Sequence, residues 1–110
     1  MAIGAAWDIS DPAKPWALWD DDANIVIPIG VLDWLAEIGT TYGSHTVTAV
    51  SPLQCADPGT YSGGTIGVRM KLAAGAAFTA GKKYPFTIRI IGADAITQDE
   101  RTLWLKVKER

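Results

Sequence analysis

The chain has 110 residues, of which 48% are hydrophobic, and its formal net charge is −2. This length fits a single domain that buries a core of its own, and the nearly balanced charge excludes a general attraction to nucleic acid or to anionic membranes. The apolar stretches are short and interrupted, so no segment is expected to span a bilayer as a helix.

Residues 1–23 differ in composition from the rest of the chain. They contain three tryptophans, two prolines and a run of three aspartates, namely Trp7, Trp16, Trp19, Pro12, Pro15 and Asp20–Asp22. Because proline removes a backbone donor and keeps the preceding residue extended, this segment is predicted to be an extended arm rather than a sheet strand. The tryptophans indicate that the arm docks, either on its own domain (residues 24–110) or on a neighbouring protein.

The first part of that domain contains an edge strand and an ambiguous segment. Residues 24–29 have the composition of a strand, but Pro28 cannot donate to a central ladder, which places it on an edge or at a strand end. Residues 31–38 fit either two turns of helix stopped by Gly39 or an irregular extended crossing. Trp34 is expected in the core in both cases.

The rest of the sequence, from residue 45 onward, shows mainly the patterns of β-strands. Residues 45–50 are rich in β-branched side chains, and residues 52–57 form a weaker candidate. Apolar and polar residues then alternate in three segments, 65–72, 84–91 and 101–110, as expected of strands with one buried face. The turn signals predict about six or seven strands, so the predicted fold class is an all-β, antiparallel β-sandwich.

Few residues are suited to catalysis or metal binding. The chain has one histidine, one cysteine and no Gly-x-Ser-x-Gly motif, so no catalytic residue and no cofactor are predicted. Cys55 is interpreted as a small buried thiol and His45 as a solvent-facing turn residue. The Asp20–Asp22 run lacks the spacing of a calcium loop and is interpreted as a solvated hinge, so no metal is predicted.

The surface residues suggest contacts with proteins. Trp104 falls on the face opposite Leu103 and Leu105, so it is expected outside the core, either covered by the N-terminal arm or offered to a partner. The predicted partner-binding residues are therefore Trp7, Trp16, Trp19 and Trp104. Two small basic spots, Lys82-Lys83 and Lys106 to Arg110, are interpreted as lysines that protect strand edges, not as nucleic-acid contacts.

Roughly residues 24–110 resemble a family of small bacteriophage tail proteins, the fiber-tail adaptor proteins. The resemblance lies in an ordered set of segments, Val31–Leu35, His45–Ala49, Gly63–Met70, Lys83–Ile90 and Asp99–Val107. It implies an immunoglobulin-like sandwich that joins tail fibers or spikes to the tail tube, nozzle or adaptor ring. It also implies many copies of the chain around the tail, and no catalysis, nucleic acid or membrane.

The expected location is therefore the virion, after synthesis in the host cytoplasm. The start of the chain lacks the cationic region and long apolar run of a secretory signal, and a single cysteine excludes an internal disulfide. A sugar-binding β-sandwich, with tryptophans that stack on sugar rings, is the alternative from another functional class. A tryptophan arm with prolines is a poor rigid platform for sugars, which favours the assembly role.

Overall fold

A computed structural model describes residues 7–10, 14–19, 26–75, 77–79 and 81–108 of the chain. Most of these residues lie in strands, and one short helix accompanies them. The elements are, in chain order, β1 (Trp7–Asp8), β2 (Trp16–Trp19), β3 (Ile27–Gly30), α1 (Leu32–Ile38), β4 (Tyr42–Ala49), β5 (Leu53–Asp57), β6 (Tyr61–Ser62), β7 (Thr65–Leu72), β8 (Lys83–Gly92) and β9 (Gln98–Val107).

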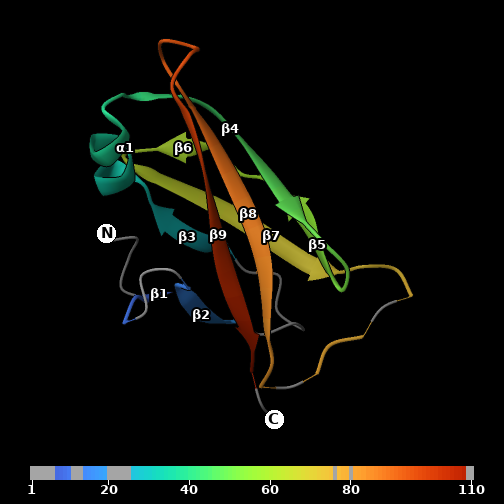
Figure 1. The fold of residues 1–110 in the computed structure, drawn as a ribbon. Helices are drawn as coiled ribbons and strands as arrows, with labels where there is room; N and C mark the ends of the chain where they lie inside the picture. Colours follow the sequence, from blue (N-terminus) through green and yellow to red (C-terminus); the bar gives the residue numbers. More distant parts are fainter. Residues whose placement is uncertain (1–6, 11–13, 20–25, 76, 80, 109–110) are drawn as a thin grey trace.

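The strands form two sheets that pack face to face (Figure 1). Sheet A has the order β1-β2-β9-β8-β4, and sheet B has the order β3-β7-β5, with β6 beside the first half of β7. The predicted all-β, sandwich-like fold is confirmed. The described chain has more strands than predicted because β1, β2 and the two-residue β6 were not expected.

The core lies between the two sheets, and the predicted alternation supplies it. In β7, β8 and the second half of β9, every second side chain is buried, namely Ile66, Val68, Met70, Tyr84, Phe86, Ile88, Ile90, Leu103, Leu105 and Val107. Strands β8 and β9 pair as an antiparallel hairpin in sheet A, whereas β7 crosses into sheet B. The inward faces of both sheets are therefore those that the period of two predicted.

The N-terminal segment corrects one prediction. Residues 16–19 form β2, which pairs in parallel with β9, so the expectation of an arm without a sheet strand is wrong for these residues. Pro15 does not prevent the pairing because it precedes the strand and contributes only its carbonyl, which accepts the Trp104 N–H at 2.9 Å. The Asp20–Asp22 run and the predicted boundary at residue 23 lie outside the described residues.

The segment after β3 is helical, which decides between the two alternatives. Helix α1 ends at Gly39, whose φ of 75° is left-handed and whose N–H bonds to the carbonyls of Leu35 and Ala36. Trp34 and Leu35 are buried beneath the helix, as expected for Trp34. The helix covers the end of the sandwich where β9 begins (Figure 1).

The sheet edges also differ in part from expectation. Pro28 lies on β3 at the edge of sheet B, as predicted. The final strand β9, however, is not an edge, because β2 covers one side of it and β8 the other. Lys106 therefore lies on an internal strand, and its interpretation as an edge-protecting lysine is wrong.

Candidate partner-binding site

The parallel pairing of β2 with β9 brings two distant tryptophans together. Trp16 lies directly opposite Trp104 in the register, although 88 positions separate them in the sequence. The backbone holds this register through bonds from Trp104 N–H to Pro15 O and from Lys108 N–H to Trp19 O, each 2.9 Å long. Both indole rings lie on the outer face of sheet A and are half-buried.

Alternation along β2 separates its side chains between two environments. Ala17 and Trp19 point inward, opposite Leu105 and Val107, and both are buried. Trp16 and Leu18 point outward, and Leu18 is 62% exposed. A four-residue strand therefore contributes to the core with one face and to the molecular surface with the other.

Three lysines surround the two half-buried tryptophans, Trp16 and Trp104. The ammonium of Lys83 lies 4.5 Å from the ring centroid of Trp16, and that of Lys106 lies 5.4 Å from the same centroid. Lys14 lies 5.7 Å from the centroid of Trp104. We name these five residues (Lys14, Trp16, Lys83, Trp104 and Lys106) the Trp–Lys patch.

The patch carries three lysine ammonium groups, and the strand pairing of sheet A fixes its two tryptophans in place. Lys83 and Lys106 are directly opposite each other in the β8–β9 register, where like charges repel. Their contacts with the Trp16 ring offset part of this cost, because an exposed cation–π contact contributes about 0.5–1 kcal/mol. Hydrogen bonds from the side chain and backbone of Ser10 lower the pKa of Asp8, and the nearby Lys83 lowers it further.

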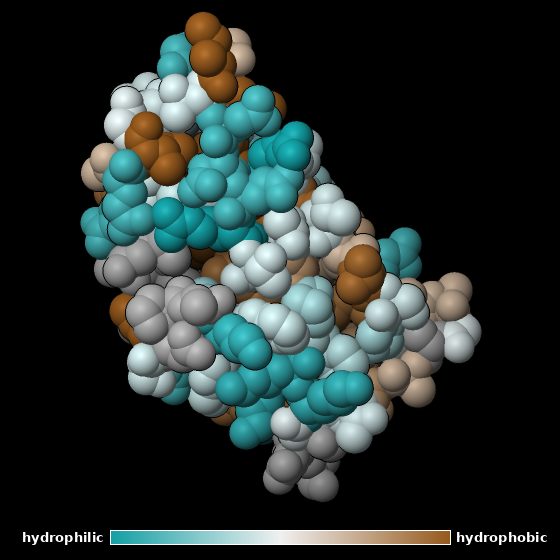
Figure 2. Space-filling model, in the orientation of Figure 1, coloured by the Kyte–Doolittle hydropathy of each residue, from teal (hydrophilic) through white to brown (hydrophobic). Residues whose placement is uncertain are grey.

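Beyond the exposed Leu18 of β2, the outer face of sheet A carries mainly polar side chains. Toward α1 it carries a Thr87–Thr102 hydroxyl contact at 3.2 Å and an ion pair between Arg89 and Glu100. Figure 2 shows this side of the molecule in mainly hydrophilic and neutral colours, with hydrophobic colour in separate spots. The Trp–Lys patch is therefore distinguished by aromatic rings and charge, not by a broad apolar surface.

The other two predicted partner-binding tryptophans are in the protein's own core. Trp7 is 6% exposed, and its Nε1 donates to the Pro28 carbonyl at 2.8 Å. Trp19 is 1% exposed and contacts Phe78 edge to face, with 5.1 Å between the ring centroids. The N-terminal segment was predicted to dock either on its own domain or on a neighbouring protein. Trp7 and Trp19 dock on the protein's own domain.

His45 makes hydrogen bonds within the fold, and Cys55 is partly buried in it. His45 lies on β4 rather than in a solvent-facing turn, and its Nε2 is 2.8 Å from the Pro58 carbonyl. Since a carbonyl only accepts, Nε2 donates to it, and Nδ1 accepts from the Tyr42 hydroxyl at 2.6 Å. Burial raises the pKa of the half-buried Cys55 thiol, which keeps it protonated at neutral pH.

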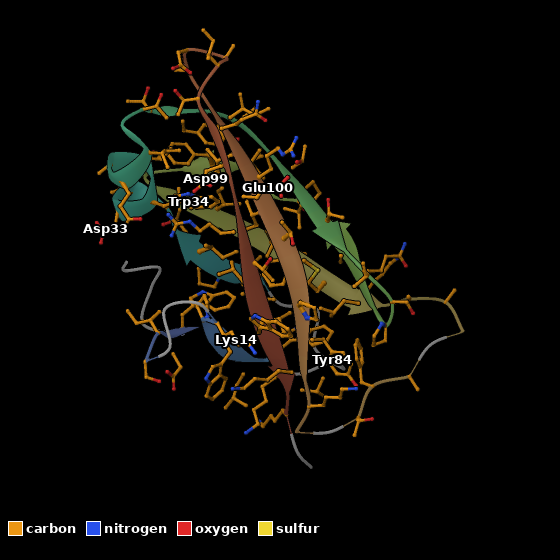
Figure 3. The ribbon with its side chains drawn as sticks, in the orientation of Figure 1. Lys14, Asp33, Trp34, Tyr84, Asp99 and Glu100 are labelled. Carbon is orange, nitrogen blue, oxygen red and sulfur yellow. The ribbon has the colours of Figure 1, made fainter. Side chains whose placement is uncertain are left out.

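A second polar cluster joins α1 to β9, as Figure 3 shows for Trp34 and Asp99. Trp34 Nε1 donates to Asp99 Oδ2 at 2.8 Å, and Arg101 bonds both Asp99 and Glu37. Burial alone raises the pKa of Asp99, but the hydrogen bonds from Trp34 and Arg101 outweigh it, so this pKa lies below its usual range. The cluster holds the helix against the sheet.

The described residues show neither a metal-binding cluster nor a membrane-spanning helix. Within the described ranges, no three or more His, Cys, Asp or Glu side chains lie close enough together to hold a metal ion. None of the helical residues that the structure describes forms a segment long and apolar enough to cross a membrane.

Sequence reasoning found part of the patch. It placed Trp104 outside the core but treated Lys83 and Lys106 as separate basic spots, and it did not single out Lys14. The alternation held a usable signal for two of these residues, because Trp104 and Lys106 fall on the same face of the predicted strand 101–110, opposite Leu103 and Leu105. The structure adds Lys83, which lies opposite Lys106 in the β8–β9 register. Trp16 was not placeable beside them, since a parallel pairing between the two ends of a chain leaves no local signal.

Comparison with known protein families, with curated proteins and with solved structures found no match for this chain.

Proposed function

We propose that this chain is a structural assembly protein without enzymatic activity, and that it binds other proteins through the Trp–Lys patch. The observation that carries the proposal is the pairing of Trp16 with Trp104 on the outer face of sheet A, beside three lysines. Tryptophan is enriched at the centres of protein interfaces because it buries a large area at a small cost in side-chain entropy. The lysines favour a partner surface that carries carboxylates.

The proposed setting is the tail of a bacteriophage. The resemblance of residues 24–110 to fiber-tail adaptor proteins supports it. In that setting the protein joins tail fibers or spikes to the tail tube, nozzle or adaptor ring, and several copies stand around the tail. Neither nucleic acid nor a membrane takes part, and the protein's location is the virion.

An immunoglobulin-like connectivity belongs to the same proposal. With β2 counted first and the two-residue strands left out, the second, fifth and fourth strands form sheet B. The third, sixth and seventh lie together in sheet A. Constant-type immunoglobulin domains group these strands in the same way. The first strand differs, because β2 lies beside the last strand and not beside the second.

The assembly role is tested with phage particles produced from the source genome. The Trp16→Ala/Trp104→Ala variant is compared with Thr87→Ala/Thr102→Ala, a control on the same face of sheet A. We expect both purified variants to stay folded, and only the tryptophan variant to be missing from gradient-purified particles. Normal incorporation of the tryptophan variant would overturn the role of the patch. Absence of the wild-type chain from intact, fiber-bearing particles would overturn the adaptor function.

Carbohydrate binding is a second function that one observation favours. Trp16 lies on a paired strand next to Trp104, and such a pair is a more rigid platform for stacking sugar rings than an arm would be. The surrounding lysines would select anionic sugars. Calorimetric titration with neutral and sulfated oligosaccharides tests this function. Binding that Trp16→Ala/Trp104→Ala removes would support it, and no heat with any oligosaccharide would exclude it.

A further inference from the structure

Strand β4 is the open border of sheet A. It runs from Tyr42 to Ala49 and pairs with β8 on one side, and none of the described strands pairs with it on the other (Figure 1). An unpaired strand edge presents backbone N–H and C=O groups that another strand can complete.

The register identifies which groups face the open side. On β8 the Gly92 N–H points to the β9 side, where it bonds to Thr97, and the next residue, Ala93, bonds to Thr41 before β4. Backbone groups alternate in direction along a strand, so Thr87 and Arg89 face β4 and bond to Thr48 and Thr46, their register partners. The backbone groups of His45, Val47 and Ala49 therefore point to the open edge.

The other sheet borders carry features that hinder further pairing, whereas none of the described strands covers the open side of β4. Strand β3 carries Pro28, whose carbonyl accepts the Trp7 indole N–H, and the described part of β1 spans two residues. Strand β5 has a register shift between Cys55 and Asp57. Strand β4 contains neither a charged residue nor a proline, and its only irregularity is at its start, between Tyr42 and Ser44.

The sequence of β4 is self-complementary. In an antiparallel pairing centred on Val47, that residue faces its own copy, Thr46 faces Thr48, and His45 faces Ala49. Cross-strand threonine pairs are favourable, and an uncharged strand brings no like charges together. The three outward-facing residues on each strand supply roughly six backbone hydrogen bonds to such a pair.

We propose that β4 pairs with β4 of a second copy of this chain about a two-fold axis at Val47. The pairing joins two copies of sheet A into one continuous sheet and leaves both Trp–Lys patches on the same side of it. This contact is isologous and closes with two subunits. It is independent of the proposed function, since it involves none of the residues of the patch.

Two double variants test the pairing by sedimentation velocity and light scattering over a concentration series. Thr46→Glu/Thr48→Glu places like charges opposite each other across the two-fold axis, whereas Thr46→Glu/Thr48→Lys places opposite charges there. We expect the first variant to raise the dimer dissociation constant about tenfold or more relative to the second. Circular dichroism checks that both remain folded. Equal dissociation constants, or a wild-type chain that stays monomeric at the highest soluble concentration, would overturn the proposal.

Amide hydrogen exchange on the wild-type chain tests the same register without any variant. The amides of His45, Val47 and Ala49 should become protected as the protein concentration rises. Those of Thr46 and Thr48, which bond to β8, should be protected at every concentration. Protection of the first set that does not change with concentration would overturn the pairing.

Discussion

At the scale of single residues, the buried tryptophans Trp34 and Trp19 differ in whether the indole N–H has a hydrogen-bond partner. Trp34 donates to the Asp99 carboxylate and also lies under the Arg101 guanidinium, 5.2 Å from the ring centroid. The buried Trp19 Nε1 has no hydrogen-bond partner among the residues that the structure describes. Since an unpaired buried donor costs free energy, the two residues stabilise the fold to different degrees although both are 1% exposed.

This difference is measurable with one substitution made at two positions. Phenylalanine at either site removes the same atoms and leaves a similar cavity, but only Trp34→Phe also removes a hydrogen bond to a charged group. We expect Trp34→Phe to lower the free energy of unfolding by about 1.5–3 kcal/mol more than Trp19→Phe does. Urea unfolding of both variants measures it, and equal losses would show that the Trp34–Asp99 bond adds no net stability.

At the scale of elements, β2 does more for the domain than an arm would do. It supplies Ala17 and Trp19 to the core and completes the border of β9, and β1 beside it adds Trp7. The contact of Trp7 with Phe86, 6.3 Å between ring centroids, extends this packing to the centre of sheet A. The N-terminal segment is thus part of the sandwich where it is described.

Removal of residues 1–19 is therefore expected to unfold the domain. Loss of a buried tryptophan costs about 3–5 kcal/mol, and two such losses reach the typical net stability of about 5–15 kcal/mol for a domain. Thermal unfolding followed by circular dichroism should show no cooperative transition for the truncated chain. A truncated chain that melts cooperatively near the wild-type temperature would restore the interpretation of this segment as a docked arm.

At the scale of the whole molecule, polar contacts at the periphery surround an apolar core and link the layers. Trp7 bonds to Pro28 across the two sheets, His45 bonds to Pro58, and Trp34 in the helix bonds to Asp99 in sheet A. No charged or polar residue is fully buried among the residues that the structure describes. The charged groups therefore lie at the solvent-accessible rim, where a change in pH can alter their protonation.

Acid should weaken the fold in part through Asp99. Its pKa is lower in the folded protein than in the unfolded chain, where aspartate titrates near pH ~3.9. Its stabilising contribution is therefore fully present above that pH and is lost as the pH falls through the folded-state pKa. We expect Asp99→Asn to be less stable at pH 7 and to lose less stability between neutral and acidic pH than the wild type. Parallel pH profiles of the unfolding free energy for the two proteins would contradict this role.

Local pattern in the sequence was sufficient for much of the fold. The period of two in β7, β8 and β9 predicted the buried faces, Gly39 marked the end of residues 31–38 if they were helical, and Pro28 predicted an edge or a strand end. Each of these depends on a residue and its near neighbours, because side-chain direction and φ are set locally. The sequence by itself therefore determined the sandwich class and most of the core.

Only the tertiary structure decided the Trp–Lys patch and the role of the N-terminal segment. Both depend on the parallel alignment of Trp16–Trp19 with Trp104–Val107, two segments at opposite ends of the chain. Parallel pairing between distant strands needs no turn signal, and a strand as short as β2 has too few residues to show a period. The pairing of β2 with the free edge of β9 therefore decides which tryptophans are buried in the core and which contact solvent. That edge and the space beside it exist only in the folded sheet.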